Sequence, residues 1–448
     1  MNLKTGAISI VLLSLFISAS FAQEMNTASP PSDLIIYVDF AGFLDLNNPE
    51  KTYQEIYLSF PNFQLAYMEK GMKFIAAYRF SIDITDSTGS QIEHKEWEQV
   101  NQIDSLDQAE GLTSLEIAAF LLTPGLYSVK IEVKDLNSGA TGFADKLMTV
   151  SKFQPDGMQL SEIEFARSIR KSGSRNKFVK NNIEVLPYPS RVFGIESPFL
   201  MFYAEIYNLN HGDSLLKEYS IIDNNSKTIE SSTKTIQVQS STSVWVEKIN
   251  TLNIISGKYL LRLKVTNKST HTAAEREAGL WIDNPYKVVS LNQYNDDNLK
   301  EFRSQIVYLV DQNELKFFDE LNIPAKIQYI NDFWNKKKPE FRAEHLKRYF
   351  IAQERFGSPT IPGWKSDRGR IYIMFGPPDQ VDREPASVNT RAFEVWFYES
   401  LENQGRVEFV FCDFGILGNY QLIHSNLKSG EQVEIYNPEW EDEVMISP

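Results

Sequence analysis

The N-terminal third of the chain alternates between apolar and polar residues, a pattern typical of strands with one buried face. The clearest run places six alternate residues on one side: Phe74, Ala76, Tyr78, Phe80, Ile82 and Ile84. A turn at residues 86–89 ends this run. A second run, after Pro124-Gly125, places four more residues on one side: Tyr127, Val129, Ile131 and Val133. Such strands, separated by turns, predict a β-sandwich over residues 30–153.

The strand that begins at Gly125 has a near copy at Gly257. Residues 125–135 read Gly-x-Tyr-x-Val-x-Ile-x-Val-x-Asp, and residues 257–267 read Gly-x-Tyr-x-Leu-x-Leu-x-Val-x-Asn. Earlier in each region, Glu-Ile-Tyr at residues 55–57 recurs at residues 205–207. Two explanations of this repeat are open. A Gly-x-Tyr strand start could arise at the edge of any β-sandwich, or the chain could contain two domains of one type. The two ordered matches favour a second immunoglobulin-like β-sandwich over residues 183–285, and each tyrosine suits a corner that bonds back to the backbone.

The segment between the two predicted domains, residues 154–182, is basic. It carries Arg167, Arg170, Lys171, Arg175, Lys177 and Lys180. Too few aromatic residues interleave with these charges to favour a nucleic-acid or glycan patch. We interpret the segment as a solvated linker, or as the start of the second domain, between two acidic domains.

From Asp296 the spacing of apolar residues becomes helical. Helices are expected to begin near Asp296, at Pro324 and at Pro339, and the last of them to stop at Gly357. Strands are then predicted over residues 370–375, 393–398, 407–414 and 420–425. Helices followed by strands describe an α+β domain, here over residues 290–430, with an acidic tail at residues 431–448. The expected fold class is therefore mixed: two β-sandwiches followed by an α+β domain.

The first residues have the order of a secretory signal peptide. Lys4 precedes an apolar run at residues 8–17, and small residues follow up to Ala22. The alternative is an anchor helix, but the run is shorter than the roughly 20 residues that span a bilayer. We expect cleavage of residues 1–22, no transmembrane segment afterwards, and export to the periplasm or the cell surface.

The net charge limits the classes of partner that we expect, and the cysteine and histidine content limits the chemistry. The formal net charge of −14 disfavours nucleic acid and anionic lipid as main partners. The single cysteine, Cys412, cannot form an internal disulfide and lies in a predicted strand, so we expect a buried structural thiol. The five histidines show no metal-ligand spacing. We therefore expect no metal and no cofactor.

One segment concentrates charged and aromatic residues between glycines and prolines. It runs without a break from residue 362 to residue 379 as Pro-Gly-Trp-Lys-Ser-Asp-Arg-Gly-Arg-Ile-Tyr-Ile-Met-Phe-Gly-Pro-Pro-Asp. Gly363-Trp364-Lys365-Ser366-Asp367 resembles the motif of the GWxTD domain of bacterial envelope proteins. The residues up to Asp379 continue that pattern, as do the Phe-Trp pair at 333–334 and Trp396 in its strand. The resemblance covers roughly residues 290–430.

This chain departs from the family pattern at two places. Ser366 replaces a threonine and keeps its hydroxyl, while Lys-Lys-Lys-Pro at residues 336–339 replaces a segment that usually contains Arg-Asp-Pro. The resemblance implies the family's fold and export, with sandwich domains upstream. It implies no reaction.

We expect a candidate interaction site at Trp364, Ser366, Asp367, Arg368, Arg370, Asp379 and Trp396. Three interpretations remain open for these residues. Arginine–carboxylate pairs hold irregular loops together, arginines beside a tryptophan suit a carboxylate, phosphate or sugar, and Asp367 with Asp379 or Glu394 offers an acid–base pair. A strand at residues 370–375, about 20 Å long, would separate Asp367 from Asp379.

The expected function is that of an exported envelope protein without enzymatic activity, which binds a protein or glycan partner or serves as a structural component. The alternative is a hydrolase that acts on a cell-wall or extracellular polymer through the carboxylates of this block. That alternative requires two carboxyl groups within roughly 9.5 Å of each other.

Overall fold

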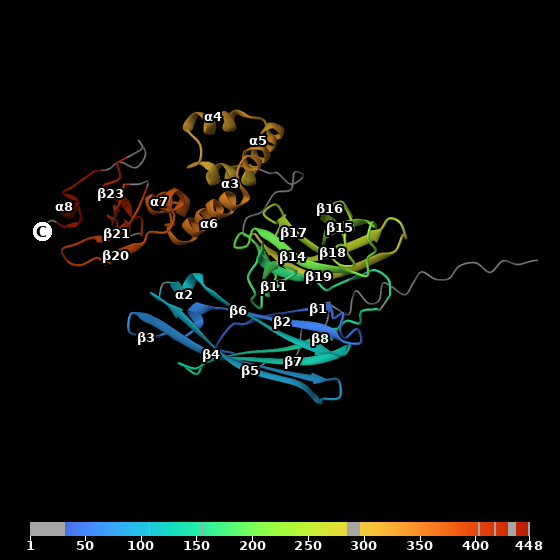
Figure 1. The fold of residues 1–448 in the computed structure, drawn as a ribbon. Helices are drawn as coiled ribbons and strands as arrows, with labels where there is room; N and C mark the ends of the chain where they lie inside the picture. The colour runs from blue at the N-terminus through green and yellow to red at the C-terminus, as the bar shows by residue number, and fades with distance from the viewer. Residues whose placement is uncertain are drawn as a thin grey trace, which may run out of the picture.

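The computed structural model describes residues 32–106, 108–154, 156–284, 296–401, 404–415, 418–428 and 436–446. The expected signal peptide at residues 1–22 lies outside these ranges. The chain is mostly β-sheet, and its longer helices lie toward the C-terminus, as expected (Figure 1). This arrangement agrees with β-rich N-terminal units followed by an α+β region.

The first β unit consists of two sheets that share one core. One sheet has the order β1 (Tyr37–Leu44), β2 (Thr52–Pro61), β6 (Thr113–Leu122). The other has the order β5 (Gln91–Ile103), β4 (Lys73–Asp86), β7 (Gly125–Asp135), β8 (Thr141–Val150), and β3 (Met68–Lys70) also pairs with β4. The short helices η1 (Asn62–Gln64) and α2 (Gln108–Gly111) connect strands.

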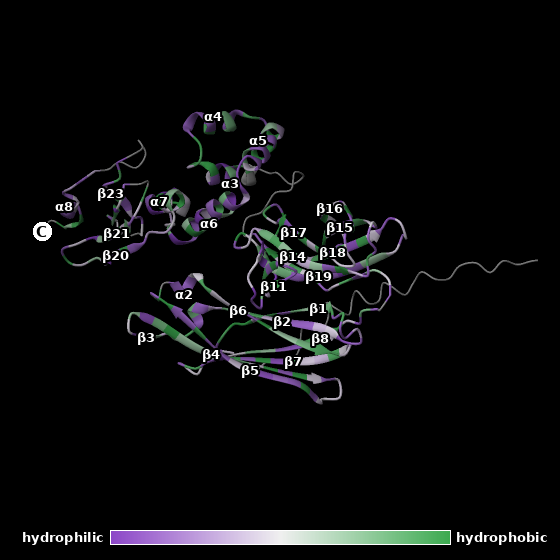
Figure 2. Cartoon of the chain, in the orientation of Figure 1, coloured by the Kyte–Doolittle hydropathy of each residue, from purple (hydrophilic) through white to green (hydrophobic). Residues whose placement is uncertain are grey.

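Both predicted alternating runs are strands of this unit. Except for the half-buried Phe74, the predicted inward residues of β4 and β7 point into the shared core, where Phe80 and Ile82 are at most 1% exposed. In contrast, β5 is mostly exposed and is largely hydrophilic in Figure 2. Burial of one face of each central strand is therefore the main source of stability in this unit.

The second β unit repeats the strand order of the first. One sheet contains β10 (Glu164–Lys171), β14 (Phe199–Tyr207) and β17 (Ser243–Asn250), extended by β9 (Gln159–Leu160), β11 (Val179–Lys180) and β12 (Ile183–Pro187). The other contains β16 (Thr228–Gln237), β15 (Ser214–Asp223), β18 (Gly257–Asn267), β19 (Ala273–Asp283) and β13 (Val192–Gly194). The order β10-β14-β17 corresponds to β1-β2-β6, and β16-β15-β18-β19 corresponds to β5-β4-β7-β8. The sequence repeat is therefore also a structural repeat.

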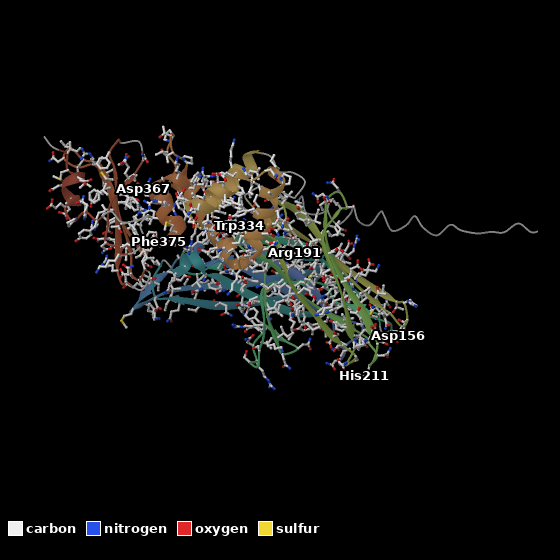
Figure 3. The ribbon with its side chains drawn as sticks, turned by 90° about the horizontal axis from the view of Figure 1, so that it is seen from above. Asp156, Arg191, His211, Trp334, Asp367 and Phe375 are labelled. Atoms are coloured by element: carbon white, nitrogen blue, oxygen red, sulfur yellow. The ribbon has the colours of Figure 1, made fainter. Side chains whose placement is uncertain are left out.

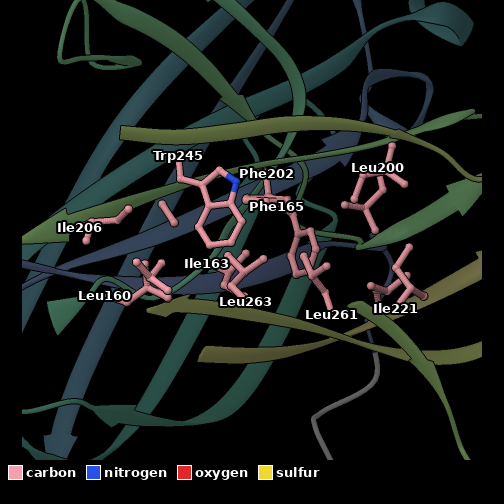
Figure 4. Close-up of a cluster of buried hydrophobic side chains, with 14 of the residues drawn as sticks. Leu160, Ile163, Phe165, Leu200, Phe202, Ile206, Ile221, Trp245, Leu261 and Leu263 are labelled. Atoms are coloured by element: carbon pink, nitrogen blue, oxygen red, sulfur yellow. The ribbon is translucent and has the colours of Figure 1, made fainter. Parts of the chain in front are cut away.

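The core of the second unit lies between its two sheets around Trp245, which is 1% exposed (Figure 4). Each unit also contains the predicted tyrosine corner. The hydroxyl of Tyr127 donates to the carbonyl of Thr123 at 2.8 Å, and that of Tyr259 donates to the carbonyl of Ile255 at 2.7 Å.

The two β units pack directly on each other. Strand β2 shows the effect, because residues 54–60 are all buried instead of alternating. Ile56, Leu58 and Phe60 enter the core of the first unit, whereas Tyr57 joins a second cluster with residues from the other unit: Ala166, Val185 and Tyr203. The equivalent three-stranded sheets of the repeat thus face each other, and four sheets stack in sequence (Figure 1).

This packing corrects the interpretation of residues 154–182 as a solvated linker, and it agrees with the alternative that they start the second unit. The segment contains β9, β10 and β11, and the side chain of Lys180 is only 15% exposed. The basic residues are needed there because the facing sheet presents buried acids: Lys180 pairs with Glu55 and Lys177 pairs with Glu116. Charge composition alone does not distinguish such an interface from a solvated linker.

The C-terminal region begins with helices that form their own core. These are α3 (Asp296–Ile306), α4 (Gln312–Glu320), α5 (Ile323–Asn335) and α6 (Pro339–Arg355). The three predicted helices are confirmed, although α3 ends before Leu309 and Val310, and α4 is additional. Phe302, Phe318 and Trp334 are among the buried residues of this helical core, which Ile195 of the second β unit also enters. Polar contacts such as the 2.7 Å bond between Lys347 and Glu196 border that contact.

A four-stranded antiparallel sheet follows, in the order β20 (Gln380–Glu384), β21 (Ala392–Tyr398), β22 (Val407–Asp413), β23 (Gln421–Ser425). The last three strands are as predicted. Helices α6 and α7 (Asp367–Phe375) cover one face of this sheet. The other face is covered by α8 (Trp440–Val444), so the described part of the predicted acidic tail, residues 436–446, packs on the sheet through Trp440 and Val444.

Candidate functional site

The predicted strand at residues 370–375 is wrong, because these residues belong to helix α7. The hydroxyl of Ser366 decides the local structure: it accepts the N–H of Gly369 at 3.0 Å and donates to the carbonyl of Gly363 at 2.8 Å. An N-cap serine followed by an aspartate starts a helix. The sequence Ile371-Tyr372-Ile373 suggests a strand only because all three residues are buried, which hides the helical period.

The two glycines of this turn allow close approaches of the backbone. A Cβ at Gly369 would lie 1.8 Å from the carbonyl oxygen of Gly363, and a Cβ at Gly363 would lie 2.1 Å from that of Ala352 in α6. Only glycine fits at either position. The two glycines of the motif therefore allow the start of α7 to pack closely against α6.

Asp367 joins helix α7 to the edge of the sheet. One carboxylate oxygen accepts the backbone N–H of Leu422 in β23 at 2.9 Å, and the other accepts from Arg370 at 3.1 Å. Asp367 keeps 35% of its side chain exposed, and Arg370 keeps 18%. In Figure 3, Asp367 and Phe375 mark the two ends of α7.

Arg368, the second residue of α7, forms a largely buried ion pair with Glu394. Its Nη1 donates to Glu394 Oε1 at 3.2 Å and its Nη2 to the carbonyl of Gly418 at 3.1 Å, while its guanidinium lies 3.9 Å from the ring centroid of Tyr420. Trp396 donates its indole N–H to the other oxygen of Glu394 at 2.9 Å. Burial raises the pKa of Tyr420, as does the Glu394 charge. Both oxygens of Glu394 are thus engaged, and the residue is 8% exposed.

The remaining candidate residues are also tied to the domain itself. Asp379 is exposed, yet its carboxylate accepts the N–H of Glu399 at 2.7 Å. The carbonyl of Trp364 accepts the hydroxyl of Tyr308 at 3.0 Å, and its ring packs partly buried against the core under α7. Burial raises the pKa of Tyr308 to about 12, so this hydroxyl remains a donor.

Comparison with protein families identifies this region. The family model described as the GWxTD domain matches residues 284–437. The chain carries a GWxTD domain. The resemblance drawn from the block at residues 362–379 is confirmed, and within the domain the block forms the junction of α6, α7 and β23. Because Ser366 uses only its hydroxyl, the replacement of threonine by serine preserves the junction.

Other comparisons add no functional argument. No curated protein sequence matches the chain. A Bacteroides uniformis β-glucuronidase structure has 10% identity and a TM-score of 0.19, with 57% of this chain and 32% of that chain covered. A putative β-galactosidase from Bacteroides fragilis has 6% identity and a TM-score of 0.17, with 50% and 32% covered. The chain spans about a third of the length of these enzymes, and the superposition is too poor to support a conclusion.

The structure brings the candidate residues of the GWxTD block together around α7, but not as one open surface. Ser366 and Trp396 are 5% and 2% exposed, so neither is available to a partner in the folded domain. Asp367 bonds to Leu422, which lies in register two strands away from Glu394, or about 10 Å at normal strand spacing. Each of these carboxylates is already engaged. Sequence reasoning treated Glu394 only as an acid–base partner, although its position two residues before Trp396 indicates a shared buried face.

A pocket of about 270 Å³ lies in the helical part of the GWxTD domain, and sequence reasoning missed it. It is lined by Leu309, Val310, Glu314, Tyr329, Asp332, Phe333, Lys336 and Lys337. The two acids have partners, because Glu314 accepts the hydroxyl of Tyr329 and Asp332 accepts the amide of Gln328. Within the described residues, Lys336 makes no ion pair, and Lys337 lies 5.5 Å from the ring of Phe333. The only sequence signal for this rim was the lysine run at residues 336–338.

The described ranges also bear on metal binding, membrane crossing and thiol chemistry. They contain no group of three or more metal-ligating side chains. Nor do they contain a helix with the length and hydropathy to cross a bilayer. Cys412 is a buried free thiol, as predicted, and burial raises its pKa.

Proposed function

We propose that this protein is an exported, non-enzymatic component of the cell envelope whose GWxTD domain binds a protein or glycan partner. The signal peptide expected at residues 1–22 supports export. The observation that carries the binding role is the pocket formed by the α3–α4 connection, α4, α5 and the residues after α5. There apolar side chains lie beside two lysines and two acids, and both acids already accept hydrogen bonds within the domain. Such a combination suits a ligand with an apolar part and an anionic group.

The block at residues 362–379 has a different role in this proposal. Its hydroxyl, carboxylates and arginines join α7 to α6 and the sheet, so the block stabilises the domain that carries the pocket. The acid–base alternative gains no support from a pair of carboxylates that are already engaged.

We also propose that both β units are immunoglobulin-like sandwiches. Strands β1, β2 and β6 correspond to A, B and E, and β5, β4, β7 and β8 correspond to C′, C, F and G. The tyrosine corner at the start of strand F supports this assignment in each unit. The units would hold the GWxTD domain at a fixed position.

The test is affinity capture from native envelopes with the mature chain and two charge-reversal variants. Lys336→Glu changes the rim of the pocket, and Lys338→Glu changes a neighbouring exposed lysine that does not line it. We expect a partner retained by the wild type and Lys338→Glu but lost by Lys336→Glu. Equal retention by both variants would remove the pocket from the proposal. Polymer degradation by the wild type, abolished in Glu394→Gln, would replace binding with hydrolysis.

A further inference from the structure

Two carboxylates and one ammonium lie buried between the two β units. Lys180 of β11 donates to Glu164 of β10 at 2.8 Å and also bonds to Glu55 of β2, in the facing unit. The side chains of Glu55 and Glu164 are 6% and 0% exposed. With every group charged, the cluster would carry one uncompensated negative charge out of contact with water, which is energetically costly.

The surroundings of Lys180 favour its charged form. Its ammonium lies 4.3 Å from the ring centroid of Phe43 and 5.4 Å from that of Tyr203. Burial alone lowers the pKa of Lys180, but the two carboxylates outweigh this effect and raise it. The excess charge must therefore be removed at a carboxylate, not at the lysine.

Glu164 is the carboxylate that takes up the proton. Glu55 accepts both the hydroxyl of Tyr57 and the ammonium of Lys180. One oxygen of Glu164 is bonded to Lys180, whereas its Oε1 is buried without a hydrogen-bond partner among the described residues. An unpaired oxygen costs less in a neutral carboxyl than in a carboxylate. Burial raises the pKa of Glu164 from 4.5 to about 7, and the Glu55 charge adds to this effect.

The charged and titratable groups around Glu164 come from both units. Glu55 and Tyr57 face it from β2, Lys180 from β11 and Tyr203 from β14. Farther out on β1, Asp39 is neutralised by Arg191 of the second unit at 2.7 Å. We propose that the cluster of Glu55, Glu164 and Lys180 is a proton-binding site that couples the docking of the two β units to pH.

The direction of the pH dependence follows from which state of the two units binds the proton. In the docked state Glu164 keeps its proton up to a pH near 7, whereas in separated units it is solvated and loses the proton near pH 4.5. Between these values the docked state holds more protons, so rising pH favours opening, by up to about tenfold in the opening equilibrium per pH unit. Above about pH 7 the dependence on Glu164 ends.

The experiment is hydrogen exchange of the full chain between pH 5 and 8, corrected for intrinsic exchange rates, with β2 and β10 as reporters. In the wild type we expect the opening of these strands to increase with pH. Glu164→Gln mimics the protonated carboxyl, so it should stay protected at every pH. The matched control is Glu184→Gln, which removes a carboxylate that is 8% exposed and paired with Arg170, and it should keep the wild-type pH dependence.

A second variant removes the charge of Glu55, which has the same sign as that of Glu164. Glu55→Gln leaves Glu164 alone with Lys180, so it should shift the wild-type transition to lower pH. The proposal is overturned if Glu164→Gln retains the wild-type pH dependence, or if the wild type shows no change over this range. Neither outcome bears on partner binding by the GWxTD domain, which the capture experiment tests separately.

Discussion

Asp367 Oδ2 accepts the backbone N–H of Leu422 at 2.9 Å, so one side chain joins the first turn of α7 to strand β23. Because β23 is an edge strand of its sheet, this amide has no neighbouring strand on that side in the described part of the chain. A carboxylate that occupies an edge amide also prevents another strand from pairing there.

Replacing Asp367 with alanine should lower the free energy of unfolding of the GWxTD domain by about 1–3 kcal/mol, because it leaves the Leu422 amide unpaired. Asp367→Asn should cost less, since its amide oxygen can still accept. Urea denaturation followed by tryptophan fluorescence measures the loss, and hydrogen exchange at Leu422 locates it. If the Asp367→Ala protein keeps wild-type stability but loses its partner, Asp367 takes part in binding and does not stabilise the domain.

The hydroxyl of Ser366 should be the only part of that side chain that the fold requires. Ser366→Ala removes the N-cap and should cost about 1 kcal/mol, within the usual range of 0.5–2. Ser366→Thr keeps the hydroxyl and should stay within about 0.5 kcal/mol of the wild type. Chemical denaturation of the two variants side by side measures the difference. Equal losses would show that the side chain's volume, and not its hydroxyl, is the constraint.

His345 should make the GWxTD domain less stable in acid. Burial lowers the pKa of His345 below 6.5, although its ring N–H donates to the carbonyl of Gln305 at 2.6 Å. The unfolded chain therefore binds a proton that the folded domain does not, and the contribution of His345 is complete above pH 6.5 and decreases as the pH falls below it. Denaturation midpoints between pH 5 and 8 test this. His345→Gln should flatten the profile, whereas Gln at the exposed His211 should leave it unchanged.

The two tyrosine corners should contribute similar amounts to their units. Tyr127→Phe and Tyr259→Phe each remove a hydroxyl that bonds to a backbone carbonyl, so each should cost about 0.5–1.5 kcal/mol. Tyr53→Phe is the matched control, because Tyr53 is 41% exposed, and it should change stability by less than about 0.5 kcal/mol. Thermal melting of the three proteins measures the effects. A loss in only one unit would show that the corners are not equivalent.

The strands with one buried face were predictable because alternation records burial directly, as in β4 and β7. The repeat was visible for the same reason, since Tyr127 and Tyr259 occupy matching positions. The stacking of the two units was not predictable, because the outward residues Glu55 and Tyr57 look like an ordinary solvent-facing side until a second sheet covers them.

The candidate block was located correctly along the chain, but its structure was not. Burial of Ile371, Tyr372 and Ile373 from more than one side removed the periodicity that distinguishes helix from strand. The sequence Ser366-Asp367-x-Gly369 contained the helix N-cap, but the strand propensity of the residues after it obscured this signal. The pocket is lined by residues of α4, α5 and the segments next to them, and no pattern along a single helix reveals it.

The burial of β2 on both faces has a mechanical consequence. A force directed along the facing sheets would have to shear one sheet across the other, and it would break the contacts of Tyr57 and Asp39 together. We therefore expect the two units to respond to load as one body, because their facing sheets share buried residues. The length of this body across the stack is set by sheet spacing, at about 10 Å for each pair of stacked sheets.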